Sequence, residues 1–249
     1  MKRREILRIG TIGAAALALG YGGNGLLETF AEKYDDIPLL GRYANTEENI
    51  GRILERAGDS EIYVFVGERH PDSTIYSGVL LPLIKSGKFS SIYLEALGKG
   101  DYRREGPDLF NSIIVKYNPD KYERIVEKSL EEDMEVHGIN SRGSCEEDGV
   151  SDWAKYITEH GRHGSKIVLT GGGHLYSWRR YRRRKNHDIL PAYLSDFGVP
   201  GERIVTMSTF ITGEIPPGLY RTRDLPEVKN ESLRILKEKR ATDYIWIRN

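Results

Sequence analysis

Two imidazoles and two carboxylates occupy positions in this sequence where metal-binding or acid–base chemistry could take place. His70 closes the motif Gly67-Glu68-Arg69-His70, and His174 closes the similar motif Gly171-Gly172-Gly173-His174. Glu95 ends another apolar run. Imidazoles and carboxylates are ligands of Zn²⁺, Mn²⁺, Co²⁺ and Fe²⁺, and they also act as general acids and bases. Glu68, His70, Glu95 and His174 are therefore the candidate catalytic and metal-binding residues.

The glycines of the two motifs have a separate expected role. Gly67, Gly171, Gly172 and Gly173 would let the backbone turn away from a strand and bring peptide N–H groups close to a bound ligand. A single Gly-x-x-His usually marks nothing more than a turn. Two such motifs together with two glutamates indicate a site, because several groups of complementary chemistry would then converge.

The elements that must position these residues alternate between two patterns. Short apolar, β-branched runs predict strands at 61–66, 91–94, 134–139, 166–170 and 203–208, and an edge strand at 243–248. Helical spacing covers most of the intervening segments, including 47–57, 72–86, 119–132, 151–160 and 232–239. This alternation predicts an α/β fold, with a mostly parallel sheet and helices on both faces, in a single domain.

The predicted topology would bring the two motifs together. The carboxyl ends of parallel strands lie along one edge of the sheet, where open α/β folds bind their ligands. His70 and His174 lie about 100 residues apart in the chain but would meet at this edge, with Glu68, Glu95 and Asn140.

The N-terminus resembles a twin-arginine export signal. Arg3 and Arg4 are followed by Ile6-Leu7 and by an apolar run at 9–19, which is too short to span a bilayer comfortably. We expect residues 1–25 to be this signal and a linker, and residues 26–249 to be the α/β domain. The protein would then be periplasmic, extracellular or anchored, and an uncleaved N-terminus would contact the membrane.

Composition excludes several function classes. Lysine and arginine balance aspartate and glutamate at 37 each, so no nucleic-acid partner is expected. The one cysteine, Cys145, allows neither an internal disulfide nor a multi-cysteine metal site. It precedes three acidic residues, which disfavour a thiolate nucleophile. The sequence contains neither the Gly-x-Ser-x-Gly elbow of serine hydrolases nor a P-loop.

The other histidines and a basic run give weaker indications of function. His160 and His163 would lie at the opposite edge of the sheet, so we interpret this pair as structural. His137 would lie within a strand, where it is either a core side chain or close enough to the site to support one of its residues. Residues 178–185 contain five arginines and a lysine. They form either a solvated helical face or a contact for an anionic substrate.

The positions of Glu68, His70, Glu95 and the Gly171–His174 motif resemble the TIKI/TraB and ChaN/erythromycin-esterase-like superfamily over roughly residues 62–208, and the Gly198-Val199-Pro200 segment is similar to ChaN-type sequences. The resemblance implies a common α/β core with its active site at these residues. It also implies metal-dependent peptidase activity as in TIKI-like members, ester hydrolysis with a histidine base as in erythromycin-esterase-like members, or haem binding as in ChaN-like members. The long insertion typical of the peptidase members is not evident here.

Three functions follow as alternatives. The first is a metal-dependent hydrolase of an ester or amide bond in a small-molecule or peptide substrate, with Mn, Co, Zn or Fe held by His70, His174 and one glutamate. The other glutamate would act as general base, and the glycine amides would hold the developing oxyanion. The second is a ChaN-type protein that binds haem or iron without turnover. The third is an anion-binding module that uses the triple glycine and the arginine run.

Overall fold

The computed structural model describes residues 43–70, 72–106, 110, 115–140, 147–175 and 189–248. The expected export signal, Cys145 and the basic run at 178–185 lie outside these residues. Within the described part of the chain, no helix is both long and apolar enough to cross a membrane.

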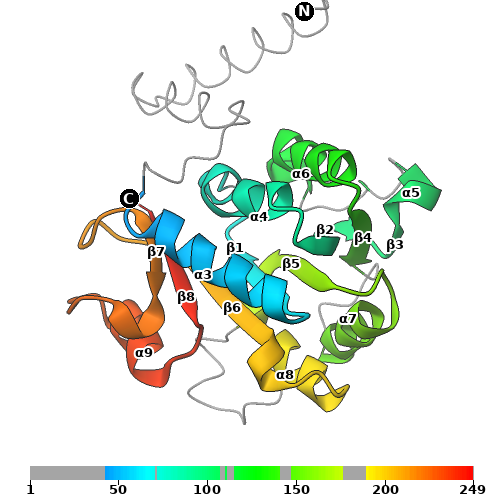
Figure 1. Ribbon diagram of the computed structural model, residues 1–249. Coiled ribbons are helices and arrows are strands. Elements are labelled where there is room, and N and C mark those ends of the chain that lie inside the picture. The colour runs from blue at the N-terminus through cyan, green and yellow to red at the C-terminus, as the bar shows by residue number, and fades with distance from the viewer. Residues whose placement is uncertain are drawn as a thin grey trace, which may run out of the picture.

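One mixed sheet organises the described residues (Figure 1). Its order is β3-β4-β2-β5-β1-β6-β8-β7. The six inner strands run parallel, whereas the edge strands β3 and β7 run antiparallel to their neighbours. The strands are β1 (Tyr63–Glu68), β2 (Phe89–Gly98), β3 (Gly100–Asp101), β4 (Glu135–Asn140), β5 (Ser165–Gly171), β6 (Ile204–Ile211), β7 (Gly218–Arg221) and β8 (Tyr244–Arg248).

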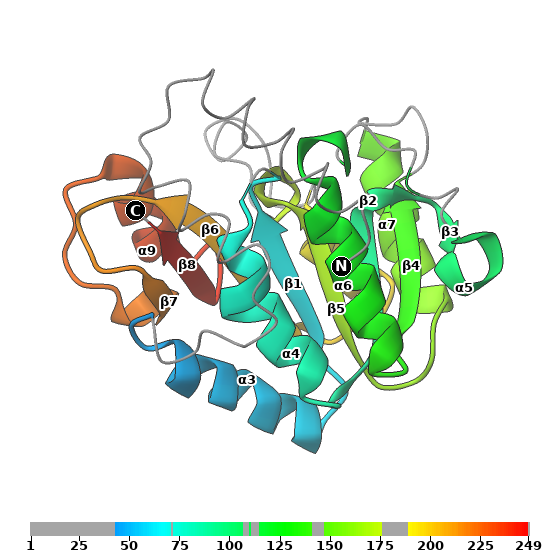
Figure 2. The same ribbon diagram turned by 90° about the horizontal axis from the view of Figure 1, so that it is seen from above.

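Helices cover both faces of the sheet (Figures 1 and 2). One face carries α3 (Thr46–Asp59), the π-helix η2 (Tyr76–Leu80), α4 (Leu81–Lys85) and α6 (Pro119–Glu131). The other carries α7 (Glu147–Glu159), α8 (Leu190–Asp196) and α9 (Glu231–Lys239). The short helix α5 (Tyr102–Glu105) follows β3 at the edge of the sheet.

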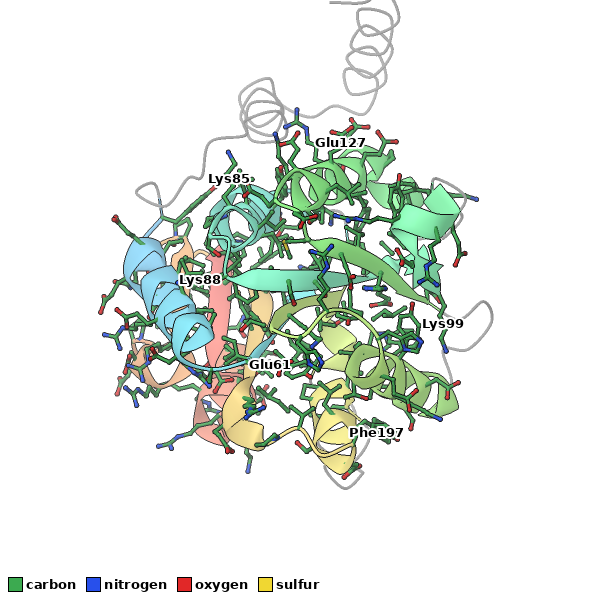
Figure 3. All side chains as sticks on the ribbon, turned by 45° about the vertical axis from the view of Figure 1, so that its right-hand side comes forward. Glu61, Lys85, Lys88, Lys99, Glu127 and Phe197 are labelled. Atoms are coloured by element: carbon green, nitrogen blue, oxygen red, sulfur yellow. The ribbon has the colours of Figure 1, made fainter. Side chains whose placement is uncertain are left out.

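Side chains of successive strand residues enter different cores. In β1, Val64 and Val66 pack beneath α3, α4 and α6, whereas Tyr63 and Phe65 pack beneath α7 and α8. Because a strand alternates its side chains between faces, a sheet buried on both sides must be apolar at nearly every position. Charged side chains such as Lys85, Lys88 and Glu127 project from the periphery (Figure 3).

The predicted fold class is confirmed, and so are strands close to the five expected inner positions. The expected edge strand at 243–248 is wrong in one respect, because β8 lies between β6 and β7 and is not at the edge. The edge strand β7 was not predicted. It is only four residues long and lies in a proline-rich segment, so it has too few residues to show an alternating pattern.

The helix that follows β1 changes type near Pro82. Residues 76–80 form a π-helix, and α4 continues from Leu81 with Pro82 in its first turn. A proline has no N–H to donate to the preceding turn, which disfavours regular α-helical bonding there. Gly78 lies in the π-helix against the indole of Trp246, where a Cβ would come 2.4 Å from a ring carbon.

Candidate active site

The four predicted site residues lie at the carboxyl edge of the sheet. Glu68 ends β1, and His70 lies two residues beyond it. Glu95 lies within β2, and His174 ends the 3-10 helix η5 (Gly172–His174), which follows β5 directly. β5 lies between β1 and β2 in the sheet, so these three neighbouring strands carry the whole set. The geometry brings the residues together in two pairs.

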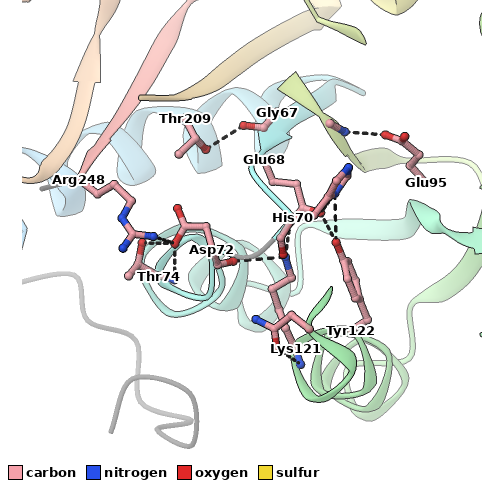
Figure 4. Close-up of polar contacts among 12 residues, drawn as sticks. Gly67, Glu68, His70, Asp72, Thr74, Glu95, Lys121, Tyr122, Thr209 and Arg248 are labelled. Atoms are coloured by element: carbon pink, nitrogen blue, oxygen red, sulfur yellow. Dashed lines mark hydrogen bonds and ion pairs between the residues drawn. The ribbon is translucent and has the colours of Figure 1, made fainter. Parts of the chain in front are cut away.

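The first pair is Glu68 and His70. The Nδ1 atom of His70 lies 3.0 Å from Oε1 of Glu68. The hydroxyl of Tyr122 donates a hydrogen bond to the same oxygen (Figure 4). The Glu68 side chain is 2% exposed and that of His70 is 26% exposed. A buried carboxylate thus faces one ring nitrogen of an imidazole that itself reaches the surface.

Lys121 completes the surroundings of Glu68. Its Nζ donates to Oε2 of Glu68 at 2.6 Å, to the carbonyl of His70 at 2.8 Å and to the carbonyl of Asp72 at 3.2 Å. The positive charge of the ammonium therefore compensates the negative charge of the carboxylate. The same ammonium also fixes the backbone of the segment that carries His70. Both members of this ion pair are almost fully buried.

Lys121 and the hydrogen bonds decide the ionisation of Glu68. Burial raises the pKa of this carboxyl, but the charge of Lys121 and the hydrogen bonds from His70, Lys121 and Tyr122 outweigh burial and lower the pKa below its ordinary value of 4.5. Burial and the nearby Glu68 raise the pKa of Tyr122, so its hydroxyl remains protonated and donates. Glu68 is then an anion that accepts, and His70 presents Nδ1–H to it.

The second pair is Glu95 and His174. Nε2 of His174 lies 3.3 Å from Oε1 of Glu95, and the amide of Gly171 donates to Oε2 of Glu95 at 2.6 Å. The ring of His174 packs edge-on against Trp153 of α7, with 4.8 Å between ring centroids. The indole nitrogen of Trp153 is buried and has no hydrogen-bond partner among the described residues.

The two pairs face each other across Gly171. A Cβ added to Gly171 would lie 3.4 Å from Nε2 of His70 and 3.5 Å from Oε2 of Glu95. The ring nitrogen of His70 that points away from Glu68 therefore lies on the same side as the second carboxylate. Figure 4 shows His70 between Tyr122 and the strand to which Glu95 is bonded.

The glycines differ in what they do. Gly67 lies inside β1 and not in a turn, and a Cβ there would come 2.7 Å from Cδ1 of Leu175, so this glycine allows close packing. The amide of Gly171 is already bonded to Glu95, so it is not available for a developing oxyanion. Gly172 and Gly173 form η5, and a Cβ on Gly173 would meet nothing within 4 Å.

The expected metal site does not fit this donor arrangement. Glu68 turns both oxygens toward hydrogen-bond donors, and the Lys121 ammonium 2.6 Å away would repel a second cation at the same carboxylate. The Glu95 oxygens face the Gly171 amide and His174. Among the residues that the structure describes, no group of three or more His, Cys, Asp or Glu side chains could hold a metal ion. Roles for a metal or for haem remain predictions.

The histidines set aside in the sequence lie elsewhere. His137 is buried in β4, where its ring stacks on Tyr93 with 5.0 Å between centroids. Burial lowers its pKa, so it is a neutral side chain within the core. The ring of His160 stacks on Tyr156 after α7, just before β5 begins. Asn140 ends β4, two strands away from β5 in the sheet.

Sequence reasoning missed Lys121, Tyr122 and Trp153. All three lie on helices, and a lysine near the start of an amphipathic helix ordinarily faces solvent. The one available signal was Asn118-Pro119, which marks a helix start and places Lys121 and Tyr122 in the first turn. That signal says nothing about burial, which depends on the helix lying over the end of β1.

No protein-family model matches this chain, and a search of the curated proteins found no match. Among solved structures, one similar chain is described as the structure of the type III effector HopBA1, with 12% sequence identity and a TM-score of 0.47. The similarity covers 80% of this chain and 92% of that chain. At this level of similarity, no property of that protein is transferred to the present one.

Proposed function

We propose that this protein is a hydrolase of an ester or amide bond, and that His70 is its general base. The observation that carries the proposal is the buried Glu68 carboxylate at Nδ1 of His70, with Nε2 and the Glu95 carboxylate both beside Gly171. A carboxylate at one ring nitrogen selects the tautomer whose other nitrogen is unprotonated and can accept a proton. Lys121 and Tyr122 support this arrangement by keeping Glu68 ionised.

The reaction would proceed by attack of water on the substrate carbonyl. As the new carbon–oxygen bond forms, a proton of the water moves to Nε2 of His70, and Glu68 stabilises the resulting imidazolium. When the tetrahedral intermediate collapses, the bond to the leaving alcohol or amine breaks and that group takes up the proton. The only co-reactant required is water.

Glu95 and His174 would act on the other side of the bound carbonyl. Their 3.3 Å contact forms a second acid–base pair, and the His174 side chain is 26% exposed. An imidazole in this position can donate a hydrogen bond to the carbonyl oxygen or a proton to the leaving group. Small-molecule and peptide substrates both remain consistent with the proposal.

The test is hydrolysis of a panel of p-nitrophenyl esters and anilides by the purified full-length protein, before and after treatment with a chelator. Replacing His70 by Asn should lower kcat/KM by at least about 100-fold, the usual contribution of a general base. The matched control is His160→Asn, which removes an exposed imidazole outside the site and should leave the rate unchanged. Equal rates for His70→Asn and the wild type would refute the assignment.

Treatment with the chelator tests whether the activity depends on a bound metal. The carboxylate oxygens of Glu68 and Glu95, which would have to bind the metal, already accept hydrogen bonds or form ion pairs within the protein. We therefore expect activity to survive chelation. Loss of activity that returns on adding Mn²⁺, Co²⁺ or Zn²⁺ would restore the metal-dependent alternative. The absorption spectrum of the same preparation tests the haem alternative, which requires a Soret band.

A further inference from the structure

A pocket rich in arginine lies far from the candidate active site. It has a volume of about 240 Å³, and its lining includes Arg56, Arg221, Arg223, Arg240, Asp243 and Tyr244. These residues come from the end of α3, the end of β7, the end of α9 and the start of β8. β8 begins here and ends at Arg248, which contacts Asp72 near His70, so the pocket and the candidate site lie toward opposite edges of the sheet.

The charge of the pocket stands out against a neutral chain. Four guanidinium groups line it, against the single carboxylate of Asp243. That carboxylate is already engaged with β6, because its Oδ2 accepts hydrogen bonds from the amide of Thr206 at 2.7 Å and from its hydroxyl at 3.1 Å. The excess of positive charge in a concave site is the arrangement that concentrates anions.

The guanidinium groups retain donors for a ligand. Arg56 uses Nη2 to donate to the carbonyl of Glu202 at 2.6 Å. Arg221 and Arg223 share one carboxylate, that of Asp224, at 3.6 and 3.5 Å. Arg240 forms no ion pair with any described residue. Because each guanidinium has five N–H donors, the described residues leave most of this donor capacity unused.

The backbone at Arg240 is a second observation. Arg240 ends α9 in the left-handed conformation, with φ 47° and ψ 44°. Its amide donates to the carbonyls of Leu236 and Lys237, a helix ending at which glycine or asparagine is the usual residue. A non-glycine residue is strained there, so glycine at this position would be more stable than arginine.

We propose that this pocket binds a small polyanion bearing phosphate groups, with the guanidinium of Arg240 as its principal contact. Guanidinium groups bind phosphate through paired hydrogen bonds, and several of them together favour a ligand that carries more than one negative charge. Because none of the predicted site residues lines the pocket, binding there does not depend on the hydrolase proposal.

The test is calorimetric titration of the full chain with inorganic pyrophosphate at low salt. We expect saturable binding that weakens as salt is added, and weaker binding of inorganic phosphate and sulfate. Replacing Arg240 by Gly should weaken pyrophosphate binding at least about tenfold, since a charge-assisted contact is lost. The same variant should have a thermal midpoint no lower than that of the wild type, because glycine relieves the strained backbone.

Two further variants make the result specific. Lys239→Ala removes a neighbouring exposed charge that does not line the pocket, so binding should change by less than about twofold. His70→Asn should bind pyrophosphate as the wild type does, which separates this proposal from the hydrolase assignment. The proposal is overturned if the wild type does not bind, if Arg240→Gly binds equally well, or if Lys239→Ala loses as much as Arg240→Gly.

Discussion

At the scale of single residues, the site depends on one buried ion pair. Lys121 and Glu68 are removed from water together, and each satisfies the other within 2.6 Å. A buried pair of this kind adds little net stability when it is intact, but removing one partner leaves an uncompensated charge and is strongly destabilising. The pair therefore serves mainly to fix Glu68 as an anion beneath His70.

The pH dependence of stability provides a test of this pair. Replacing Glu68 by Gln should lower the free energy of unfolding at neutral pH by about 3–5 kcal/mol, because Lys121 is left buried without its partner. The folded pKa of Glu68 is lowered from 4.5, so its contribution is fully present above pH 4.5 and is lost as the pH falls through the folded pKa. Denaturant unfolding at a series of pH values measures both effects. The gap between wild type and variant should narrow below pH 4.5, and a constant gap would contradict the account.

The space beside Gly171 gives a second prediction. An Ala methyl at this position would lie at contact distance from Nε2 of His70 and Oε2 of Glu95 without a clash, and the backbone there has φ −59°, which alanine adopts readily. Gly171→Ala should therefore leave the unfolding free energy within about 1 kcal/mol and lower the hydrolytic rate at least about tenfold, because the methyl occupies the space between base and carboxylate. Gly173→Ala, where a Cβ meets nothing within 4 Å, is the control and should retain the rate.

At the scale of elements, strand ends position the chemistry and helices complete it. β1, β5 and β2 are adjacent, and each delivers one part of the set to the same edge. The other partners come from α6 and α7, which lie on opposite faces of the sheet. The Glu68–His70 pair thus contacts the helix on one face, and the Glu95–His174 pair contacts the helix on the other. The two pairs approach each other at Gly171, where β5 ends.

The π-helix after β1 gives a prediction about stability. A Cβ on Gly78 would come 2.4 Å from the Trp246 ring, so Gly78→Ala should lower the unfolding free energy by about 1–3 kcal/mol through overpacking. Gly51 lies in α3, where a Cβ would meet nothing within 4 Å. Gly51→Ala should instead raise the free energy by up to about 1 kcal/mol, since alanine favours a helix over glycine. Chemical denaturation of both variants measures the two signs, and equal effects would disprove the packing argument.

The sequence patterns predicted the strands better than they predicted which side chains surround the site residues. The runs before Glu68, Glu95 and Gly171 are each built around three or more consecutive apolar residues, which is why the inner strands and their shared edge could be predicted. The partners of Glu68 could not, because the burial of Lys121 depends on how α6 packs and not on local composition. The role of Gly67 could not be predicted for the same reason. The sequence predicts a turn at this glycine, but it lies within β1 and packs against Leu175.

At the scale of the whole molecule, the parallel sheet separates two polar regions. The candidate active site lies where β1, β2 and β5 end, and the arginine pocket lies where β8 begins. The far end of β8 also supports the candidate site, because Arg248 contacts the buried carboxylate of Asp72 at 2.7 Å. Asp72 in turn accepts hydrogen bonds from the amide and hydroxyl of Thr74 in the helix that follows β1. The last strand of the chain therefore helps to hold the segment that carries His70.

The cellular location of the whole protein remains a prediction from its first residues. If the twin-arginine resemblance is functional, replacing Arg3 and Arg4 together by Lys should block export and leave the protein inside the cell, because this pathway recognises the arginine pair. Fractionation of cells expressing the wild type and the variant measures the effect. A matched replacement of Arg8 by Lys should leave export unchanged. Identical fractions for the paired variant and the wild type would rule the signal out.

The central claim is that Glu68 holds His70 with Nδ1 protonated and Nε2 free to accept a proton. Long-range ¹H–¹⁵N correlation of the histidine rings, recorded at mildly alkaline pH and assigned with His70→Asn, measures this directly and needs no substrate. We predict the Nδ1–H tautomer for His70 in the wild type and its loss in Glu68→Gln. An Nε2–H tautomer for His70 in the wild type would contradict the account, because the imidazole would then have no acceptor facing the site.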